Sequence, residues 1–289
     1  MELKRFIYII YMKIGWFLAK FKLDEIPFLR KINKSVVRLL RPKLMKIQGH
    51  TMFLDREDSL HLSYNKIFEP IFEPNETNLV KKVIKRGDVV VDIGANIGYY
   101  SLIFLKIIGE EGRVFSFEPD PYCFNLLKKN IEINHYNNAM LIQKAISNEN
   151  GRAKLYISDS YNANQTIHDL HDDRRSIEIE TIRLDDYFRD YNKRIDFIKI
   201  DTEGSEAKIL QGMPLLLQKN KDIKIMAEFW PLGLKKSGAD PAKYLELVLG
   251  YGFKIYDINE EGMDLSNAES LLKKYTAEKG NYTNLLFKR

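Results

Sequence analysis

VVVDIGANIGYYSL (89–102) joins three valines to a glycine-containing turn and then to an apolar stretch with helical spacing. We expect the valines to form a buried strand that delivers Asp92 to the edge of a sheet, and the turn to lead into a helix. Gly94 permits the positive φ of a tight turn, and Gly98 lets the backbone approach a ligand at the start of the helix. The segment therefore predicts a ligand-binding turn at the carboxyl edge of a sheet.

The spacing of the two glycines limits the kind of ligand. The phosphate-binding loop of nucleoside triphosphatases needs GxxxxGK[ST], and no such Gly-Lys pair follows Gly94. The dinucleotide fingerprint is GxGxxG, whose second glycine lets the backbone meet the pyrophosphate. Asn96 stands at that position here, which weakens the interpretation as a dinucleotide site without abolishing it.

Glu118 is the second clue to the ligand, because it ends the next predicted strand in FSFEPDP (115–121). A carboxylate in this place accepts hydrogen bonds from both hydroxyls of a ribose, a sugar common to dinucleotides and S-adenosylmethionine. Asp92 would suit a cationic amino group such as that of the methionine end. The alternative for Glu118 is an acid on the surface that caps the following helix.

Alternating strand and helix patterns follow along the chain and predict an α/β fold with a mostly parallel sheet and helices on both faces. The predicted strands are 88–93, 113–118, 139–146, 195–201, 223–229, 253–258 and 281–288, with a hairpin of 152–158 and 176–184. The predicted helices are 98–108, 121–134 and 240–252, and the stretch 205–217 is predicted to form one helix or two. We expect this domain to cover 88–289, preceded by a hairpin and lead-in helix at 47–87, which ends near Gly87, and a basic helical extension at 1–46.

The extension concentrates positive charge. It holds twelve Lys and Arg against three Asp and Glu, although the whole chain of 289 residues has a net charge of only +5. The body is therefore mildly acidic, which argues against nucleic acid as a partner. Aromatic residues and flanking cations in 6–21 suit a helix lying on an anionic membrane surface, and a helix packed on the body is the alternative. We expect neither a membrane span nor a cleaved signal peptide. A single cysteine, Cys123, excludes an intramolecular disulfide and fits a cytoplasmic protein, peripheral at the inner face of the membrane.

The order of several short motifs resembles that of the FkbM family of S-adenosylmethionine-dependent methyltransferases. These motifs are FEPNET, VVVDIGANIGYYSL, VFSFEPDP, KAISNENG, IETIRLDDY, DFIKIDTEGSEAKILQG and MAEFWP, and the similarity covers about residues 60–258. The resemblance implies a Rossmann-like class I methyltransferase fold with a seven-stranded sheet whose last strand is antiparallel. It also implies the cofactor, S-adenosyl-L-methionine, which the spacing of the glycines alone leaves open.

Carried over to this sequence, the resemblance assigns seven residues to the cofactor. The turn would be formed by Asp92, Gly94, Asn96 and Gly98, the ribose would be held by Glu118, and the adenine would contact Ala145 and Ile146. Residues 1–60 lie outside the motifs and inherit no role.

The densest polar cluster is IKIDTEGSE (198–206). Lys199 and Asp201 share one strand face, and a buried lysine there needs a carboxylate partner, for which Asp201 or Glu228 is suitable. We expect an acid and base cluster with Asp201 as the general base and Glu203 and Glu228 as alternatives. The other interpretation is a structural ion pair, with Glu203 and Glu206 capping the next helix. Two or three of these acids with a histidine would also suit a divalent metal, but no HxxH-like spacing supports one, so none is expected.

Two residues are weaker candidates for contact with the acceptor. His168 lies in the polar stretch SYNANQTIHDLHDDRR (160–175), which is either a mobile lid or a solvated connection. Trp230 follows a strand end in EFWPLGL (228–234) and either faces a sugar or lipid-linked acceptor or packs on the neighbouring helix.

These observations lead to a hypothesis of O-methylation of a hydroxyl on a sugar, glycan or related cell-envelope molecule. A small-molecule or lipid acceptor is the main variant. A non-catalytic, cofactor-binding subunit of a membrane-associated assembly is a second hypothesis, which the intact acid cluster disfavours. An NAD-dependent oxidoreductase is a third, disfavoured by Asn96.

Overall fold

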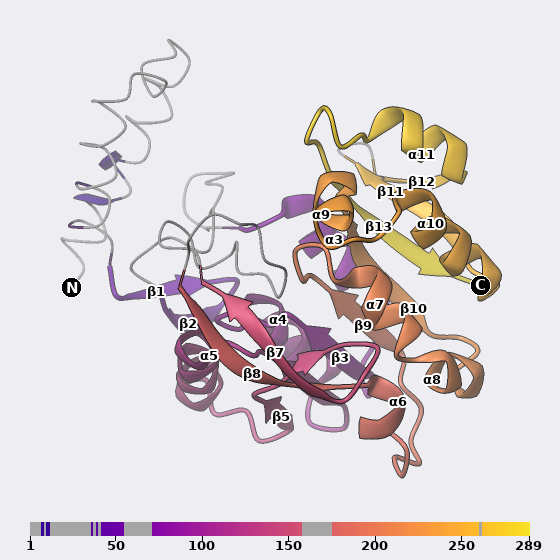
Figure 1. The fold of residues 1–289 in the computed structure, drawn as a ribbon. Coiled ribbons are helices and arrows are strands. Elements are labelled where there is room, and N and C mark those ends of the chain that lie inside the picture. The colour runs from indigo at the N-terminus through magenta and orange to yellow at the C-terminus, as the bar shows by residue number, and fades with distance from the viewer. Residues whose placement is uncertain are drawn as a thin grey trace.

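The computed structural model describes residues 42–54, 71–157, 175–259 and 262–289, together with six single positions among the first 41. Figure 1 shows a twisted central sheet with helices on both of its faces. Most of the predicted basic extension and the stretch 158–174 lie outside the described residues. In the part of the chain that is described, no helix has the length and apolar character needed to cross a membrane.

The central sheet has eight strands within the described residues, in the order β12-β11-β13-β10-β9-β3-β4-β5. Strands β5, β4, β3, β9 and β10 are parallel, and β13 runs antiparallel between β10 and β11. The strands are β3 (Val89–Ile93), β4 (Arg113–Phe117), β5 (Ala139–Ile142), β9 (Phe197–Ile200), β10 (Lys224–Phe229), β11 (Lys254–Asn259), β12 (Gly262–Ser266) and β13 (Thr283–Lys288).

The prediction of an α/β fold with a mostly parallel sheet is confirmed, and so is the antiparallel last strand. An additional edge strand, β12, pairs antiparallel with β11 and makes the sheet one strand wider than predicted. Its sequence, GMDLS, has no β-branched or aromatic residue and includes Gly and Asp, which are depleted in strands, so local propensity gives little strand signal.

Helices cover both faces of the sheet, and each face has its own apolar core. One face packs on α3, α4 and α5, and the other packs on the helices from α6 onward. The helices are α3 (Pro74–Val83), α4 (Tyr99–Ile108), α5 (Pro121–Ile133), α6 (Leu184–Tyr187), α7 (Glu206–Gln211), α8 (Pro214–Lys219), α9 (Pro231–Lys236), α10 (Pro241–Gly250) and α11 (Ala268–Lys274).

The alternation of side chains along each strand decides which polar groups meet. Val89, Val91 and Ile93 face the core under α7 and α10, so Val90 and Asp92 face α4. The register places Asp92 between Ser116 of β4 and Lys199 of β9, its neighbours in the sheet. A row of polar side chains therefore lies beneath α4, although all three strands are buried.

The stretch 139–146 was predicted as one strand, and the structure divides it. Ala139–Ile142 forms β5 at the edge of the central sheet. Ala145–Ile146 forms β6, which belongs to a separate three-stranded sheet with β7 (Gly151–Tyr156) and β8 (Ser176–Ile182). The intervening Gln143 and Lys144 are polar, and the chain leaves the central sheet at that point.

A hairpin of β1 (Leu44–Ile47) and β2 (His50–Phe53) turns at Gln48 and Gly49 and packs against α5. Asn130 of α5 bonds both the N–H and the C=O of Phe53, at 2.6 and 3.1 Å. Asn134 does the same for Thr51, at 3.0 and 2.7 Å. The two asparagine amides thus pair with backbone groups of β2 and hold the hairpin against α5.

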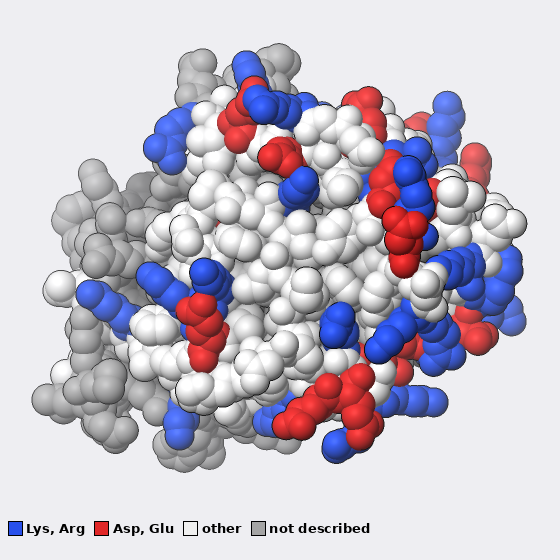
Figure 2. Space-filling view, turned by 90° about the horizontal axis from the view of Figure 1, so that it is seen from below, with Lys and Arg blue, Asp and Glu red and all other residues white. Residues whose placement is uncertain are grey.

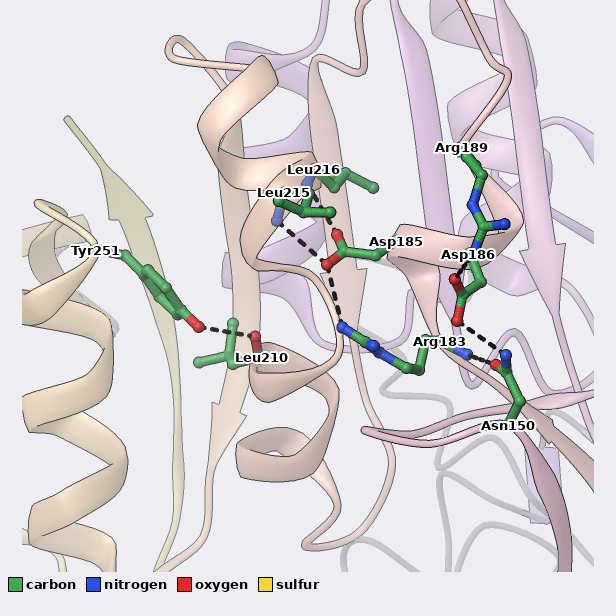
Figure 3. A network of polar contacts seen from close by, with 9 residues as sticks. All are labelled: Asn150, Arg183, Asp185, Asp186, Arg189, Leu210, Leu215, Leu216 and Tyr251. Atoms are coloured by element: carbon green, nitrogen blue, oxygen red, sulfur yellow. Dashed lines mark hydrogen bonds and ion pairs between the residues drawn. The ribbon is translucent and has the colours of Figure 1, made fainter.

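A polar network joins α6 to α8 near the amino ends of β9 and β10 (Figure 3). Asp185 is 7% exposed, and its carboxylate accepts hydrogen bonds from the backbone N–H groups of Leu215 and Leu216, at 3.2 and 2.8 Å. Arg183 also donates to Asp185, at 3.3 Å. Asp185 therefore satisfies the first N–H groups of α8, which lacks a cap of its own.

Figure 2 shows the molecule from below the view of Figure 1. Basic and acidic side chains lie next to one another around a broad uncharged centre. The described side chains on this face form no stripe of one sign.

Candidate functional site

The turn after β3 has the backbone conformation that its glycines predict. Gly94, Asn96 and Gly98 all have positive φ, at 78°, 49° and 93°. A Cβ atom on Gly94 would lie 1.9 Å from the backbone oxygen of Asp201, so this turn packs directly on the end of β9. A Cβ atom on Gly98 would lie 2.7 Å from Cδ1 of Leu127. The glycines therefore allow the turn to sit close to β9 and α5, in addition to setting its shape.

Glu118 holds this turn to the end of the neighbouring strand. Its carboxylate accepts hydrogen bonds from the backbone N–H of Asn96, at 2.8 Å, and of Asp120, at 2.9 Å. The side chain is 6% exposed, and burial raises its pKa to about 8, against the lowering effect of the two hydrogen bonds. Asp120, rather than Glu118, caps α5 through the N–H groups of Tyr122 and Cys123. The interpretation of Glu118 as a cap on the surface is therefore wrong.

Asp92 lies beneath the turn and is completely buried. One of its oxygens accepts a hydrogen bond of 2.6 Å from Ser101, which is itself 2.8 Å from the hydroxyl of Ser116. The other oxygen, Oδ1, has no hydrogen-bond partner, and neither has the buried Oδ1 of Asn96. Burial raises the pKa of Asp92, and the charge of Lys199 opposes this. Two buried acceptors without partners at one glycine turn fit a ligand that carries N–H or O–H donors.

Lys199 and Asp201 form the ion pair that the sequence led us to expect. The ammonium of Lys199 donates to Asp201 at 2.8 Å and lies 4.6 Å from the centre of the Tyr100 ring. Lys199 is 4% exposed, so burial opposes its charge, but Asp201, Asp92 and Glu73 outweigh that effect and raise its pKa. The Asp201 side chain is 34% exposed, which leaves it open to solvent at the end of β9.

Further carboxyl groups surround this ion pair. Burial, followed by the charge of Asp201, raises the pKa of Glu73 and of Glu203 to about 8. Burial, followed by the charge of Glu203, raises the pKa of Glu228 well above its usual value. Oε2 of Glu228 is buried without a hydrogen-bond partner. We call Glu73, Asp201, Glu203 and Glu228 the carboxyl cluster.

Glu206 has a structural role that differs from the helix cap considered as the alternative. Its Oε1 accepts hydrogen bonds from the N–H and hydroxyl of Thr202, at 3.1 and 2.9 Å, and from the N–H of Gly204, at 3.3 Å. Glu206 therefore holds the turn before α7, and it does not cap the helix as the alternative interpretation expected. Glu203 and Glu228 make no such cap and belong to the cluster around Asp201.

Glu73 is the member of the cluster that the sequence analysis missed. It lies immediately before α3 and accepts a hydrogen bond of 2.8 Å from the hydroxyl of Tyr100 on α4. It belongs to FEPNET, which was noted only as a lead-in to the motifs. A signal was available, since Glu73 directly precedes a proline that begins a helix, in a stretch that the resemblance already covers.

Strained backbone is concentrated at this site. Five non-glycine residues of the described chain have positive φ. Three of them are Glu73, Asn96 and Glu203, with φ of 44°, 49° and 53°. Such conformations cost free energy for an L residue and persist where the surrounding structure enforces them, most often at functional sites.

The remaining candidate residues are less closely associated with the turn. Ala145 and Ile146 are buried in β6, where Ile146 belongs to the core beneath the central sheet and Ala145 to the core of the small sheet. Trp230 packs on Gly233, where a Cβ atom would lie 2.1 Å from the indole ring. The ammonium of Lys236 lies 5.9 Å from the centre of that ring. His168 lies outside the described residues.

Among the described residues, no group of three or more His, Cys, Asp and Glu side chains is arranged to hold a metal ion.

The chain is similar in sequence to known methyltransferases. The family model "Methyltransferase FkbM domain" matches residues 92–255, from the cofactor turn to β11. Methyltransferase sdnD of Sordaria araneosa is 27% identical over 155 residues, covering 43% of this chain and 60% of that protein. The 31-O-demethyl-FK506 methyltransferase FkbM of Streptomyces tacrolimicus is 29% identical over 160 residues, covering 45% and 61%. The chain thus matches about 60% of the length of these two curated relatives.

Among solved structures, fibrillarin of Aeropyrum pernix, crystallised with natively bound S-adenosyl-L-methionine, aligns with 84% of this chain and 92% of its own. The TM-score is 0.43 and the sequence identity 12%.

Proposed function

The chain belongs to the FkbM family of methyltransferases, and from this we propose that it transfers a methyl group from S-adenosylmethionine to a hydroxyl group of a sugar, glycan or related cell-envelope molecule. The single observation that carries the proposal is the glycine turn held by the Glu118 carboxylate, with the unpartnered oxygens of Asp92 and Asn96 beside it.

Each part of the turn has a proposed role toward the cofactor. Glu118 accepts from the ribose hydroxyls with the lone pairs that its two backbone donors leave free. Asp92 and the Asn96 amide oxygen attract the amino group of the methionine end. Gly94 and Gly98 keep the backbone in the conformation that exposes this surface, and Ala145 and Ile146 form an apolar wall for the adenine. The cofactor supplies an electrophilic methyl group on a sulfonium, and the protein supplies alignment and proton removal.

Asp201 is the proposed general base. It combines a place at the carboxyl end of β9, partial exposure, and an orientation fixed by Lys199 at 2.8 Å. Glu203 and Glu228 are the next candidates, because both are carboxyl groups of the same cluster with raised pKa values. A positioned base of this kind contributes about 10²–10⁴-fold to the rate of a proton-coupled step.

The choice of a hydroxyl acceptor is supported by two observations. The relative from Streptomyces tacrolimicus is named for a methyl transfer to oxygen, on 31-O-demethyl-FK506. The carboxyl cluster offers several acceptors for the hydroxyl hydrogens of a polyol. The same relative supports the variant of a small-molecule acceptor. Trp230 and His168 are proposed contacts with the acceptor, and the basic stretch 1–46 is proposed to attract an anionic membrane surface, which binding to anionic but not neutral liposomes would test.

Calorimetry tests the cofactor assignment. The purified protein is titrated with S-adenosylmethionine, S-adenosylhomocysteine and NAD, and Glu118→Ala is compared with Glu246→Ala, a change of an exposed glutamate on α10. We expect both adenosyl ligands to bind, the affinity to fall about 10–100-fold in Glu118→Ala, and Glu246→Ala to match the wild type. Binding of NAD in place of the adenosyl ligands would overturn the proposal. A screen of sugars, glycans and natural-product alcohols with labelled methyl groups then identifies the acceptor.

A further inference from the structure

The carboxyl cluster brings together more carboxyl groups than the ammonium of Lys199 alone could neutralise if all of them were ionised. Its four members come from four segments of the chain: the residue before α3, the end of β9, the turn before α7, and β10. Glu206 adds a fifth carboxyl group, fully buried, whose Oε2 has no partner. The ammonium of Lys199 is the positive charge that acts on Glu73 and Glu203.

Among the described residues, the charges that act most strongly on the cluster come from four neighbouring segments of the chain. Glu73 faces Tyr100 of α4, Lys199 and Asp201 of β9, and Glu76 of α3. Glu203 faces Asp201, Glu206, Glu73 and Lys199. Glu228 faces Glu203, Asp201, Glu206 and Glu73, and its charge acts on Tyr244 and Tyr282. Apart from Lys199, the groups named here are acids and phenols.

Hydrogen bonds hold two of these carboxyl groups, Glu73 and Asp201, beside the same ammonium and ring. Tyr100 donates its hydroxyl to Glu73 at 2.8 Å, while its ring lies under the Lys199 ammonium. Lys199 in turn donates to Asp201. Glu73 and Glu203 are both held in left-handed backbone conformations. A purely structural site would relieve repulsion by holding fewer acids, so their enforced proximity points to a function for the shared charge.

We propose that Glu73, Glu203 and Glu228 form a proton store, which releases a proton when the cationic cofactor binds and takes up the proton that the acceptor hydroxyl loses. The inference rests on the proposed function, because it requires S-adenosylmethionine as the cofactor. It adds a role for three carboxyl groups beyond that of the base, Asp201.

The charge balance of methyl transfer explains why a proton store would help the reaction. The acceptor oxygen forms a bond to the methyl carbon, the carbon–sulfur bond breaks, and its electron pair remains on sulfur. The positive charge of the sulfonium is lost in this step. The acceptor proton passes to Asp201 and is shared with the cluster, so a negative charge is lost as well. The net charge of the site is therefore the same before and after transfer, and no charge has to be solvated in a buried place.

Calorimetry in two buffers measures the released proton directly. S-adenosylmethionine and the uncharged thioether S-adenosylhomocysteine are each titrated into the full-length protein at pH 7, in phosphate and in Tris, whose heats of ionisation differ. The difference in heat between the buffers gives the protons exchanged per ligand. A group with a pKa near 8 is mostly protonated at pH 7, so we expect S-adenosylmethionine to release about half a proton or more beyond S-adenosylhomocysteine.

Two variants and one control test whether the released proton comes from the carboxyl groups of the store. Glu73→Gln keeps an oxygen to accept the bond from Tyr100, and Glu203→Gln is a second variant on a different element. We expect each to lower the proton release on binding of S-adenosylmethionine by roughly a third or more, since the cluster titrates as a unit. Glu246→Gln, on the exposed face of α10, should leave it unchanged. The amino group of the ligand contributes equally in all four proteins, so the differences belong to the protein.

The outcomes separate the inference from the proposed function. Binding of both ligands with equal proton release in the wild type would overturn the proton store and leave the cofactor assignment intact. Proton release that is unchanged in both Glu73→Gln and Glu203→Gln would also overturn the proton store and leave the cofactor assignment intact. If neither ligand binds, the proposed function fails, and the inference fails with it.

Discussion

The carboxylate of Glu118 accepts a hydrogen bond of 2.8 Å from the backbone N–H of Asn96, and this bond ties the end of β4 to the glycine turn after β3. The pair joins two sequence signals, the glycine turn and the acid that ends the next strand, into one unit. Because the same carboxylate also accepts from the N–H of Asp120, a change at Glu118 acts on the turn and on the start of α5 together.

The raised pKa of the buried glutamates makes stability depend on pH. Glu73, Glu118 and Glu203 each have a pKa of about 8 in the folded chain, against an ordinary value of 4.5. Between these values the folded chain holds protons that the unfolded chain has lost, so the free energy of unfolding falls as pH rises through this window. One group of this kind accounts for roughly 2–3 kcal/mol between pH 6 and pH 8.5, so we expect a loss of at least that size, measured by urea denaturation. Glu118→Gln should flatten the profile, and a wild-type profile that is already flat would contradict the assignment.

Asp185 and Asp186 are adjacent and offer a matched pair of variants. Asp185→Ala removes a buried carboxylate that serves two backbone N–H groups of α8 and Arg183, and we expect it to cost about 2–4 kcal/mol of stability. Asp186→Ala removes the surface partner of Arg189 and of the Asn150 amide, and we expect a clearly smaller loss of stability than for Asp185→Ala. Thermal unfolding followed by circular dichroism compares them. Equal losses would show that Asp185 is not the cap of α8.

Variants of Asn130 and Asn134 distinguish support of the hairpin from support of the glycine turn. Both hold the β1–β2 hairpin, but Asn130 also donates to the backbone oxygen of Ile97 in the turn, at 2.8 Å. We expect each alanine variant to lower stability by about 1–3 kcal/mol, because buried backbone groups lose their partners. Only Asn130→Ala should also weaken the binding of S-adenosylmethionine in a calorimetric titration. An equal effect of Asn134→Ala on affinity would remove the link between Asn130 and the turn.

Asp201→Asn tests the proposed base. Once an acceptor is known from the labelled-methyl screen, we expect its methylation to slow by about 10²–10⁴-fold, with the dissociation constant for S-adenosylmethionine nearly unchanged. The change also leaves the Lys199 ammonium with a neutral partner, so stability has to be measured alongside activity. Full activity in this variant would assign the base to another carboxyl group of the cluster.

The part of the site that lies within one strand–turn–helix was predictable from sequence. A strand of valines with a glycine turn specifies its own conformation, because few residues tolerate positive φ. The pairing of Lys199 with Asp201 was also predictable, because residues that are two positions apart on a strand lie on the same face. The parallel order of the sheet followed from the alternation of strands and helices.

Other features depend on contacts between distant segments. Glu73 reaches the cluster only because α3 packs beside α4, and its hydrogen bond to Tyr100 spans 27 residues of sequence. The division of 139–146 into β5 and β6 depends on which sheet offers a hydrogen-bonding partner, which local propensity does not encode. The edge strand β12 is formed by pairing with β11 despite a sequence with little strand preference.

The position of β13 has a consequence for the order of folding. It lies between β10 and β11, both of which precede it in the sequence, so it has to be inserted between two segments that are already present. In the sheet, β11 and β12 are joined to the other strands only through β13 among the described residues. Such long-range pairings close large loops and therefore form slowly. We expect the amides of β11 and β12 to gain protection from hydrogen exchange no earlier than those of β13, as the last stage of refolding.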